Sequence, residues 1–153
     1  MKYVSQRATF GSSISPFIRW FRMIFLMGIW LFIACLTIQV FLAGMAVFIS
    51  SSWWSMHIMF AHFIGFLGLI LLAVVFLGRF PKQVWASTVL IVFLIAMQGF
   101  TIHLSRIPNL PLTAALHPVN ALFLFWAATA TGWRTWRIIT SKTDALQDNT
   151  NLM

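Results

Sequence analysis

The sequence predicts an all-α membrane protein, an up-down-up-down bundle of four transmembrane helices with both termini in the cytoplasm. Three observations lead to this prediction. Of the 153 residues, 61% are hydrophobic and only 8% are charged, whereas a soluble domain carries about 25% charged residues. The apolar residues are concentrated in four long runs. Nine of the ten Lys and Arg residues lie on the same side of those runs.

Each apolar run reaches the ~20 residues that an α-helix needs to cross the hydrocarbon core of a bilayer. The connections are short, and helices joined by short loops pack as antiparallel neighbours. The turn between the second and third runs contains Pro81, which does not easily continue a helix and restricts Phe80 before it. The predicted spans are residues 23–49, 56–78, 84–104 and 113–138.

The chain accordingly divides into three segments. Residues 1–22 form a cytoplasmic and interfacial N-terminal segment, in which Arg19 and Arg22 alternate with aromatic residues, as suits a membrane interface. Residues 23–140 form the four-helix transmembrane domain, and residues 141–153 form a polar cytoplasmic tail. We find no motif shared between the first and the second pair of helices.

The basic residues predict the orientation. The connection Ser50–Ser55 carries no charge and Ser105–Leu112 carries only Arg106, so both are expected outside, because Lys and Arg are retained in cytoplasmic loops. We therefore expect a multi-pass protein of a cytoplasmic (inner) membrane. Nine residues are assigned to the cytoplasmic side: Lys2, Arg7, Arg19, Arg22, Arg79, Lys82, Arg134, Arg137 and Lys142.

The same charges decide which partners are expected. A net charge of +8 indicates a nucleic-acid partner in a soluble protein. Here the charges flank apolar spans, so topology explains them and no nucleic acid is expected. The expected partners are membrane lipids and a larger membrane protein complex.

All four histidines are expected in the outer half of the bilayer. His57 and His62 lie in the first two turns of the second span, His103 ends the third span, and His117 begins the fourth. His62 is the strongest candidate because it is about 10 Å deep, and an ionisable group at that depth is costly without a partner inside the bundle. The alternative, strongest for His57 and His103, is an amphipathic interfacial side chain with a wet tip.

His62 and His117 are the predicted axial ligands of a haem iron. They lie at similar depth on the second and fourth helices, which are diagonal in an up-down bundle, and a bundle core is a usual place for such a cofactor. Gly65 and Gly68 either let helices approach closely or leave room for a flat ligand. His57 and His62 are about 140° apart around their helix, which argues against a compact zinc site.

The residues around His117 leave alternatives open. Asn120 lies on the same helical face as His117 and is a further candidate for cofactor binding. Pro118 either begins the last helix, with His117 as its cap, or kinks a helix that begins at Thr113.

Three other polar residues are secondary candidates. Gln39 and Gln98 either hydrogen-bond across the bundle as packing contacts or support a cofactor or a quinone. Arg106 either pairs with a haem propionate or a lipid phosphate, or is a solvated loop residue.

Several of these residues carry a resemblance. A histidine early in the second helix, a glycine three residues later and a histidine early in the fourth helix resemble one four-helix half of haem A synthase, and b-type cytochrome bundles more generally. The segments Gln39–Gly44, His62 with Gly65, and His117–Asn120 are similar to an uncharacterised family of small four-span bacterial membrane proteins. The resemblance covers roughly Leu31–Arg134.

The resemblance implies a haem b site. In haem A synthase the histidines of the second and fourth helices ligate haem b, which implies His62 and His117 here. This chain has Phe63 where that pattern has an arginine, and no upstream glutamate for oxidation chemistry. These departures weaken the case for an enzyme that modifies haem and leave simple haem binding open.

Two functions follow as expectations. The first is haem b binding for electron transfer near the outer membrane face, with a quinol or a larger complex. The second is a non-catalytic accessory subunit of a respiratory or photosynthetic complex that binds lipid or pigment, which suits the 16% aromatic content.

Overall fold

A computed structural model of the chain describes residues 15–108 and 110–151. The predicted cytoplasmic residues Lys2 and Arg7 lie outside this described part. Within it, the chain is entirely helical: α1 Pro16–Phe48, α2 Trp53–Leu77, α3 Lys82–Leu104, the 3-10 helix η1 Pro111–Ala115, and α4 Leu116–Asn151. Four stretches are long and apolar enough to cross a membrane. The predicted all-helical protein with four candidate spans is therefore confirmed.

The helices begin and end at recognisable signals. Pro16 opens α1, so the interfacial segment and the first span form one helix; at this position the missing N–H needs no partner. Three serines form the turn between α1 and α2. In this turn the Trp53 N–H donates a hydrogen bond to the Ser50 carbonyl at 3.1 Å. Arg79, in the turn after α2, has a φ of 45°. The polar segment after residue 141 continues α4 as a helix to Asn151.

The start of α4 follows neither of the two expected alternatives. A 3-10 turn, Pro111–Ala115, leads into α4, which begins at Leu116. Pro118 therefore lies in the first turn of α4, where main-chain N–H groups have no partner within the helix. It therefore does not open the helix, and His117 lies in the first turn itself.

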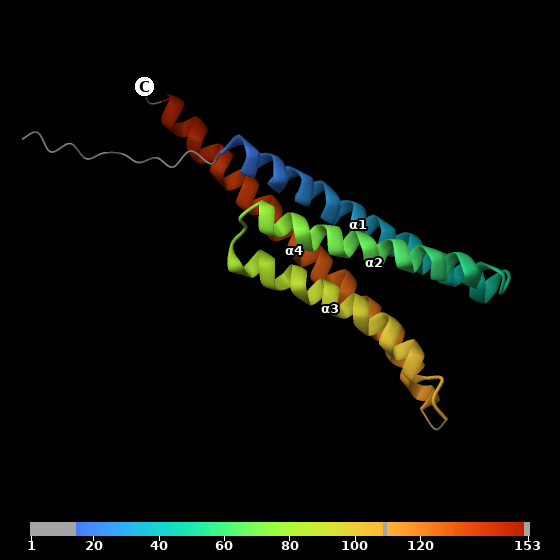
Figure 1. Cartoon of the computed structure of the whole chain (residues 1–153). Helices are drawn as coiled ribbons and strands as arrows, with labels where there is room; N and C mark the ends of the chain where they lie inside the picture. The colour runs from blue at the N-terminus through green and yellow to red at the C-terminus, as the bar shows by residue number, and fades with distance from the viewer. Residues whose placement is uncertain (1–14, 109, 152–153) are drawn as a thin grey trace, which may run out of the picture.

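Each long helix packs against two others. In the described part of the chain, α1 packs against α2 and α4, and α3 packs against the same two helices, so α2 and α4 lie diagonally. Figure 1 shows that the pairs α1–α2 and α3–α4 are close together at the turn that joins α2 to α3 and diverge away from it. We call the close end, with the 78–81 turn, the arginine end, and the divergent end, with the 49–52 and 105–115 connections, the histidine end.

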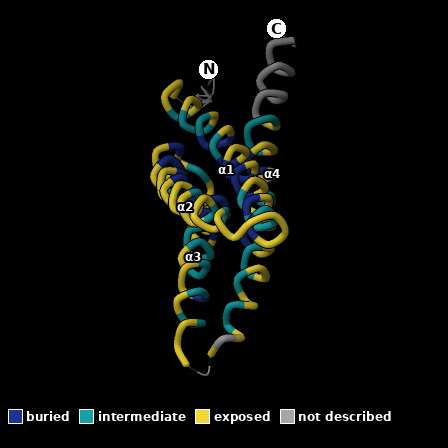
Figure 2. The backbone as a smooth tube through the Cα atoms, turned by 90° about the vertical axis from the view of Figure 1, so that its right-hand side faces the viewer, coloured by how far each residue is buried: buried dark blue, intermediate teal, exposed yellow. Residues whose placement is uncertain are grey.

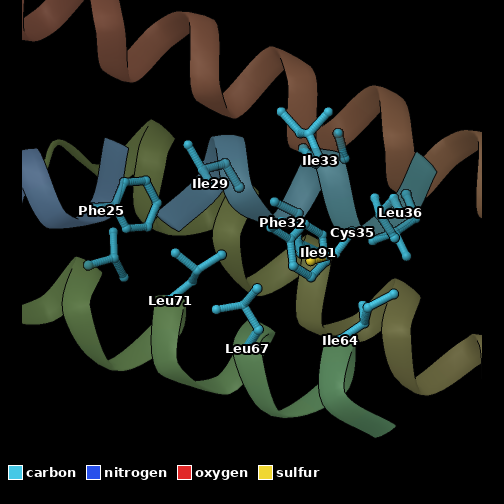
Figure 3. Packing of buried hydrophobic residues seen from close by; sticks show 14 of the residues in the cluster. Phe25, Ile29, Phe32, Ile33, Cys35, Leu36, Ile64, Leu67, Leu71 and Ile91 are labelled. Carbon is cyan, nitrogen blue, oxygen red and sulfur yellow. The ribbon is translucent and has the colours of Figure 1, made fainter. Parts of the chain in front are cut away.

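The core is apolar and lies mainly between α1 and α2, and two buried residues of α3 and three of α4 complete the cluster. Phe25, Ile29 and Phe32 of α1 are fully buried and pack against Leu67 and Leu71 of α2 (Figure 3). These α1 residues are spaced by three and four positions, so their side chains share one helical face. Leu42 and Ala46 of α1 are also buried toward the histidine end, although they lie outside the main cluster.

The outward faces of the helices are apolar and exposed (Figure 2). Phe48 is 84% exposed and Trp126 is 65% exposed. In water such a surface indicates an interaction site, whereas in a bilayer it faces lipid tails of similar polarity. Buried hydroxyl groups satisfy themselves locally, since Thr88, Thr131 and Thr135 each donate to a carbonyl four residues earlier.

Candidate functional site

The structure pairs two histidines at the histidine end, on the diagonal helices α2 and α4. The ring centres of His57 and His117 lie 6.4 Å apart with an interplanar angle of 56°, and both residues are half-buried. Trp54 packs edge-on against His57, with ring centres 5.4 Å apart. Because α2 and α4 are not packed neighbours, this ring pair reaches across between two helix pairs.

Gln39 of α1 holds His57 through a reciprocal pair of hydrogen bonds. The Gln39 side chain donates from Nε2 to the main-chain carbonyl of His57 at 2.9 Å. The His57 Nδ1 lies 3.2 Å from the main-chain oxygen of Gln39. A carbonyl oxygen only accepts, so the imidazole proton resides on Nδ1 and the Nε2 lone pair is left for a ligand.

Gln98 of α3 contacts His117 through both its main chain and its side chain. The His117 Nδ1 lies 3.1 Å from the main-chain oxygen of Gln98. We orient the Gln98 amide by its partners, since the oxygen and nitrogen of an amide have the same shape. Its Nε2 then donates to the His117 carbonyl at 3.1 Å and lies 2.9 Å from His117 Nδ1, while its oxygen accepts from the Ala121 N–H at 2.9 Å.

The two helix pairs therefore share a motif, contrary to the expectation from the sequence. A glutamine on the first helix of each pair binds a histidine on the second, 18 residues later for Gln39 and His57 and 19 residues later for Gln98 and His117. A Gln-x-Phe pattern, Gln39 to Phe41 and Gln98 to Phe100, marks both starting points. This signal is visible in the sequence, but its meaning depends on the helices being paired.

The structure does not bring together the predicted pair of His62 and His117. His62 is exposed, and its Nδ1 lies 2.8 Å from the Ile58 carbonyl one turn earlier on its own helix. The space beside the neighbouring glycines is occupied by α3: a Cβ at Gly68 would lie 2.5 Å from Ile95 Cδ1, and one at Gly65 would lie 3.8 Å from Ile95 Cγ2. Of the two roles left open for these glycines, the structure favours close helix packing.

Three remaining candidates, Asn120, His103 and Arg106, have no hydrogen bond to the ring pair within the described part of the chain, and one of them links two helices. Asn120 donates from Nδ2 to the Leu94 carbonyl at 2.9 Å, which ties α4 to α3. His103 and Arg106 are exposed near the end of α3. Gln39 Oε1 is buried and has no hydrogen-bond partner among the described residues, so an acceptor faces inward beside His57.

The donor set of the ring pair suits a metal centre that brings its own additional ligands. A metal–imidazole nitrogen bond is about 2 Å long and a ring centre lies roughly 1 Å behind its nitrogen, so two imidazoles on opposite sides of one metal place their ring centres roughly 6 Å apart. Within residues 15–108 and 110–151, no three His, Cys, Asp or Glu side chains gather as a possible metal site. The ring pair thus offers two imidazoles that could act as metal ligands.

Residues 39–103 match the model of a family of unknown function, DUF6220. The matched segment begins at Gln39, contains His57, His62 and Gln98, ends at His103 and stops before His117. No curated protein and no solved structure matches the chain. The comparisons therefore agree with an uncharacterised family and provide no link to haem A synthase or b-type cytochromes.

Proposed function

We propose that the protein is a four-span protein of the bacterial inner membrane, arranged up-down-up-down with both termini in the cytoplasm. The clustering of basic residues supports this orientation, since Arg22, Arg79 and Lys82 lie at the arginine end and the Lys and Arg of short loops stay inside. The histidine end then faces the outer side of the membrane.

We further propose that the protein binds haem b between its two helix pairs, with His57 and His117 as axial ligands. The facing ring pair, 6.4 Å between centres, carries this proposal. The proposed pair of ligands therefore differs from the pair predicted from the sequence, His62 and His117, in having His57 in place of His62. Haem supplies one-electron redox chemistry at its iron when bound, and electron exchange with a quinol or a larger complex at the outer face is the function this site supports best.

The chain's own contribution is to hold the two imidazoles. A ligating histidine commonly donates its second ring N–H to a carbonyl or carboxylate, which fixes the ring and raises its basicity. The main-chain carbonyls of Gln39 and Gln98 stand at 3.2 and 3.1 Å from the two Nδ1 atoms for this purpose.

The test is a reduced-minus-oxidised absorption spectrum of the full chain purified with its native lipids. We expect the α-band of a b-type haem, and we expect His57→Ala and His117→Ala each to abolish it. His62→Ala is the matched control, because it makes the same change on α2 at an exposed ring, and it should leave the band intact. Absence of the band, or its loss in the His62 variant alone, contradicts the proposal.

An accessory subunit that binds lipid or pigment is the second candidate. A shallow apolar hollow on α4, lined by Val119, Leu122, Phe123 and Trp126, favours it, because these side chains face outward where a tail or a flat ring can lie. Blue-native electrophoresis of the native membrane tests it. Migration within a larger complex supports the subunit role, and migration only as a monomer or dimer contradicts it.

A further inference from the structure

The two paired histidines differ in the groups around Nδ1. Beside His57, the Gln39 side-chain nitrogen donates to the main-chain carbonyl of His57, and the polar atom at hydrogen-bond distance from Nδ1 is the Gln39 carbonyl, at 3.2 Å. Beside His117, Nδ1 has two such neighbours. The Gln98 carbonyl lies at 3.1 Å and the Gln98 side-chain nitrogen at 2.9 Å.

This difference decides where each ring can carry its proton. A neutral imidazole holds one proton, on Nδ1 or on Nε2. A carbonyl accepts only, so it stabilises the Nδ1–H form, whereas an amide nitrogen donates only, so it stabilises the form with a bare Nδ1 and a proton on Nε2. His57 therefore has a partner in one form only, and His117 has a partner in both.

We propose that Gln98 makes His117 an exchangeable ligand, while His57 is a permanent one. The same single proton of His117 moves between Nδ1 and Nε2, and none is gained or lost. With the proton on Nδ1, the Nε2 lone pair is free to bind a metal. With the proton on Nε2, the ring no longer binds a metal and offers an N–H donor toward the space between the helix pairs.

The consequence for ligand binding rests on the proposed haem site. When His117 takes the Nε2–H form, the coordination position that it leaves is open to a small neutral ligand, and its Nε2–H can donate a hydrogen bond to that ligand. Carbon monoxide is the probe for such a position. A diatomic ligand is therefore expected to bind at the position of His117, on the α4 side of the site, and not at the position of His57, on the α2 side.

The direct experiment is nitrogen NMR of histidine-labelled full-length protein in lipid bilayers without haem, because the chemical shifts of Nδ1 and Nε2 report which nitrogen carries the proton. We expect His57 to show the Nδ1–H form alone and His117 to show both forms. Gln98→Met removes the amide donor and keeps the main-chain carbonyl, so His117 should change to the Nδ1–H form. Gln39→Met is the matched change beside His57 and should leave the His57 form unaltered.

The second readout is carbon monoxide binding to the reduced, haem-loaded protein. Gln98→Met removes one hydrogen bond from the displaced form of His117, so we expect roughly two- to tenfold weaker binding of carbon monoxide. His62→Ala, a change at an exposed ring outside the pair, should not weaken it.

The outcomes separate the two proposals. A single His117 form identical to that of His57 in the wild-type chain overturns the inference, and this comparison needs no variant to fold. Carbon monoxide affinity unchanged by Gln98→Met also overturns it. Absence of bound haem, with both His117 forms present, contradicts the haem proposal and leaves the tautomer assignment standing.

Discussion

The Arg22 guanidinium donates a 2.9 Å hydrogen bond from Nη2 to the main-chain carbonyl of Arg79, 57 residues later in the chain. Its Nε donates to the Gly78 carbonyl at 3.0 Å, and its Cζ lies 5.4 Å from the centre of the Phe80 ring. The last carbonyls of a helix lack partners within the helix and carry its negative end. One side chain of α1 thus closes the C-terminal end of α2.

Replacing Arg22 should weaken the arginine end. Arg22→Met keeps the length of the side chain and removes both donors, and a hydrogen bond from a charged group contributes about 1.5–3 kcal/mol. Because Arg22 is partly exposed, we expect the free energy of unfolding to fall by about 1–2 kcal/mol. Thermal unfolding in detergent, followed by circular dichroism, measures this loss.

Arg19→Met is the control for Arg22→Met. It removes the same charge from the same helix, and the Arg19 side chain is exposed. We expect no loss of stability from this change. An equal loss in both variants would show that net charge, and not the contact with α2, is responsible.

Arg79 adopts a backbone conformation that favours glycine. Its φ of 45° lies in the left-handed region, which costs a residue with a Cβ roughly 1–2 kcal/mol. Arg79→Gly removes this cost but adds freedom to the unfolded chain, so we expect a net gain of about 0.5–1 kcal/mol in the free energy of unfolding. Arg79→Ala removes the same charge and keeps the Cβ. It should give no gain in the same thermal measurement.

Glycines in the helices should respond according to what surrounds them. At Gly68 a Cβ would lie 2.5 Å from Ile95 Cδ1, and at Gly99 nothing lies within 4 Å. Gly68→Val adds branched bulk between α2 and α3 and should destabilise the protein by about 1–3 kcal/mol. Gly99→Ala fills open space and improves helix propensity, so it should be stabilising by up to about 1 kcal/mol. Thermal unfolding of both variants measures the contrast, which disappears if α2 and α3 are not closely packed.

The sequence predicts the helices well because each helix is determined by the residues within its own segment. Each run of more than twenty apolar residues specifies a span without reference to its neighbours. The depth of the histidines follows from counting residues along a helix. The diagonal relation of α2 and α4, observed in the described part of the chain, follows from the short connections, since these make consecutive helices neighbours.

The sequence predicts the facing pair of histidines poorly, because rotation about the helix axis is not a local property. His57 and His62 are about 140° apart on α2, so one of them faces the bundle when the other faces away. A helix that is apolar on all sides has no polar stripe to indicate which face is buried. In the structure His57 is on the side of α2 that contacts Gln39 of α1, and this contact depends on the register between α1 and α2.

A substitution at Asn120 tests whether this residue is a packing residue or a cofactor ligand. The sequence places it among the candidates for cofactor binding, whereas in the structure its Nδ2 donates to the Leu94 carbonyl of α3 at 2.9 Å. Hydrogen bonds between membrane helices contribute about 0.6 kcal/mol on average and up to about 1.7 kcal/mol. We therefore expect Asn120→Ala to lower the free energy of unfolding by about 1 kcal/mol, measured by thermal unfolding.

The same variant should not change the spectrum of the proposed haem complex. Its reduced-minus-oxidised spectrum should match that of the wild-type chain in position and amplitude, because the Asn120 amide is engaged with α3 and not with the ring pair. His117→Ala, three residues away on α4, is the comparison, and it should abolish the band. A shifted band in Asn120→Ala with unaltered thermal stability would indicate that Asn120 belongs to the binding site, and would contradict the packing role.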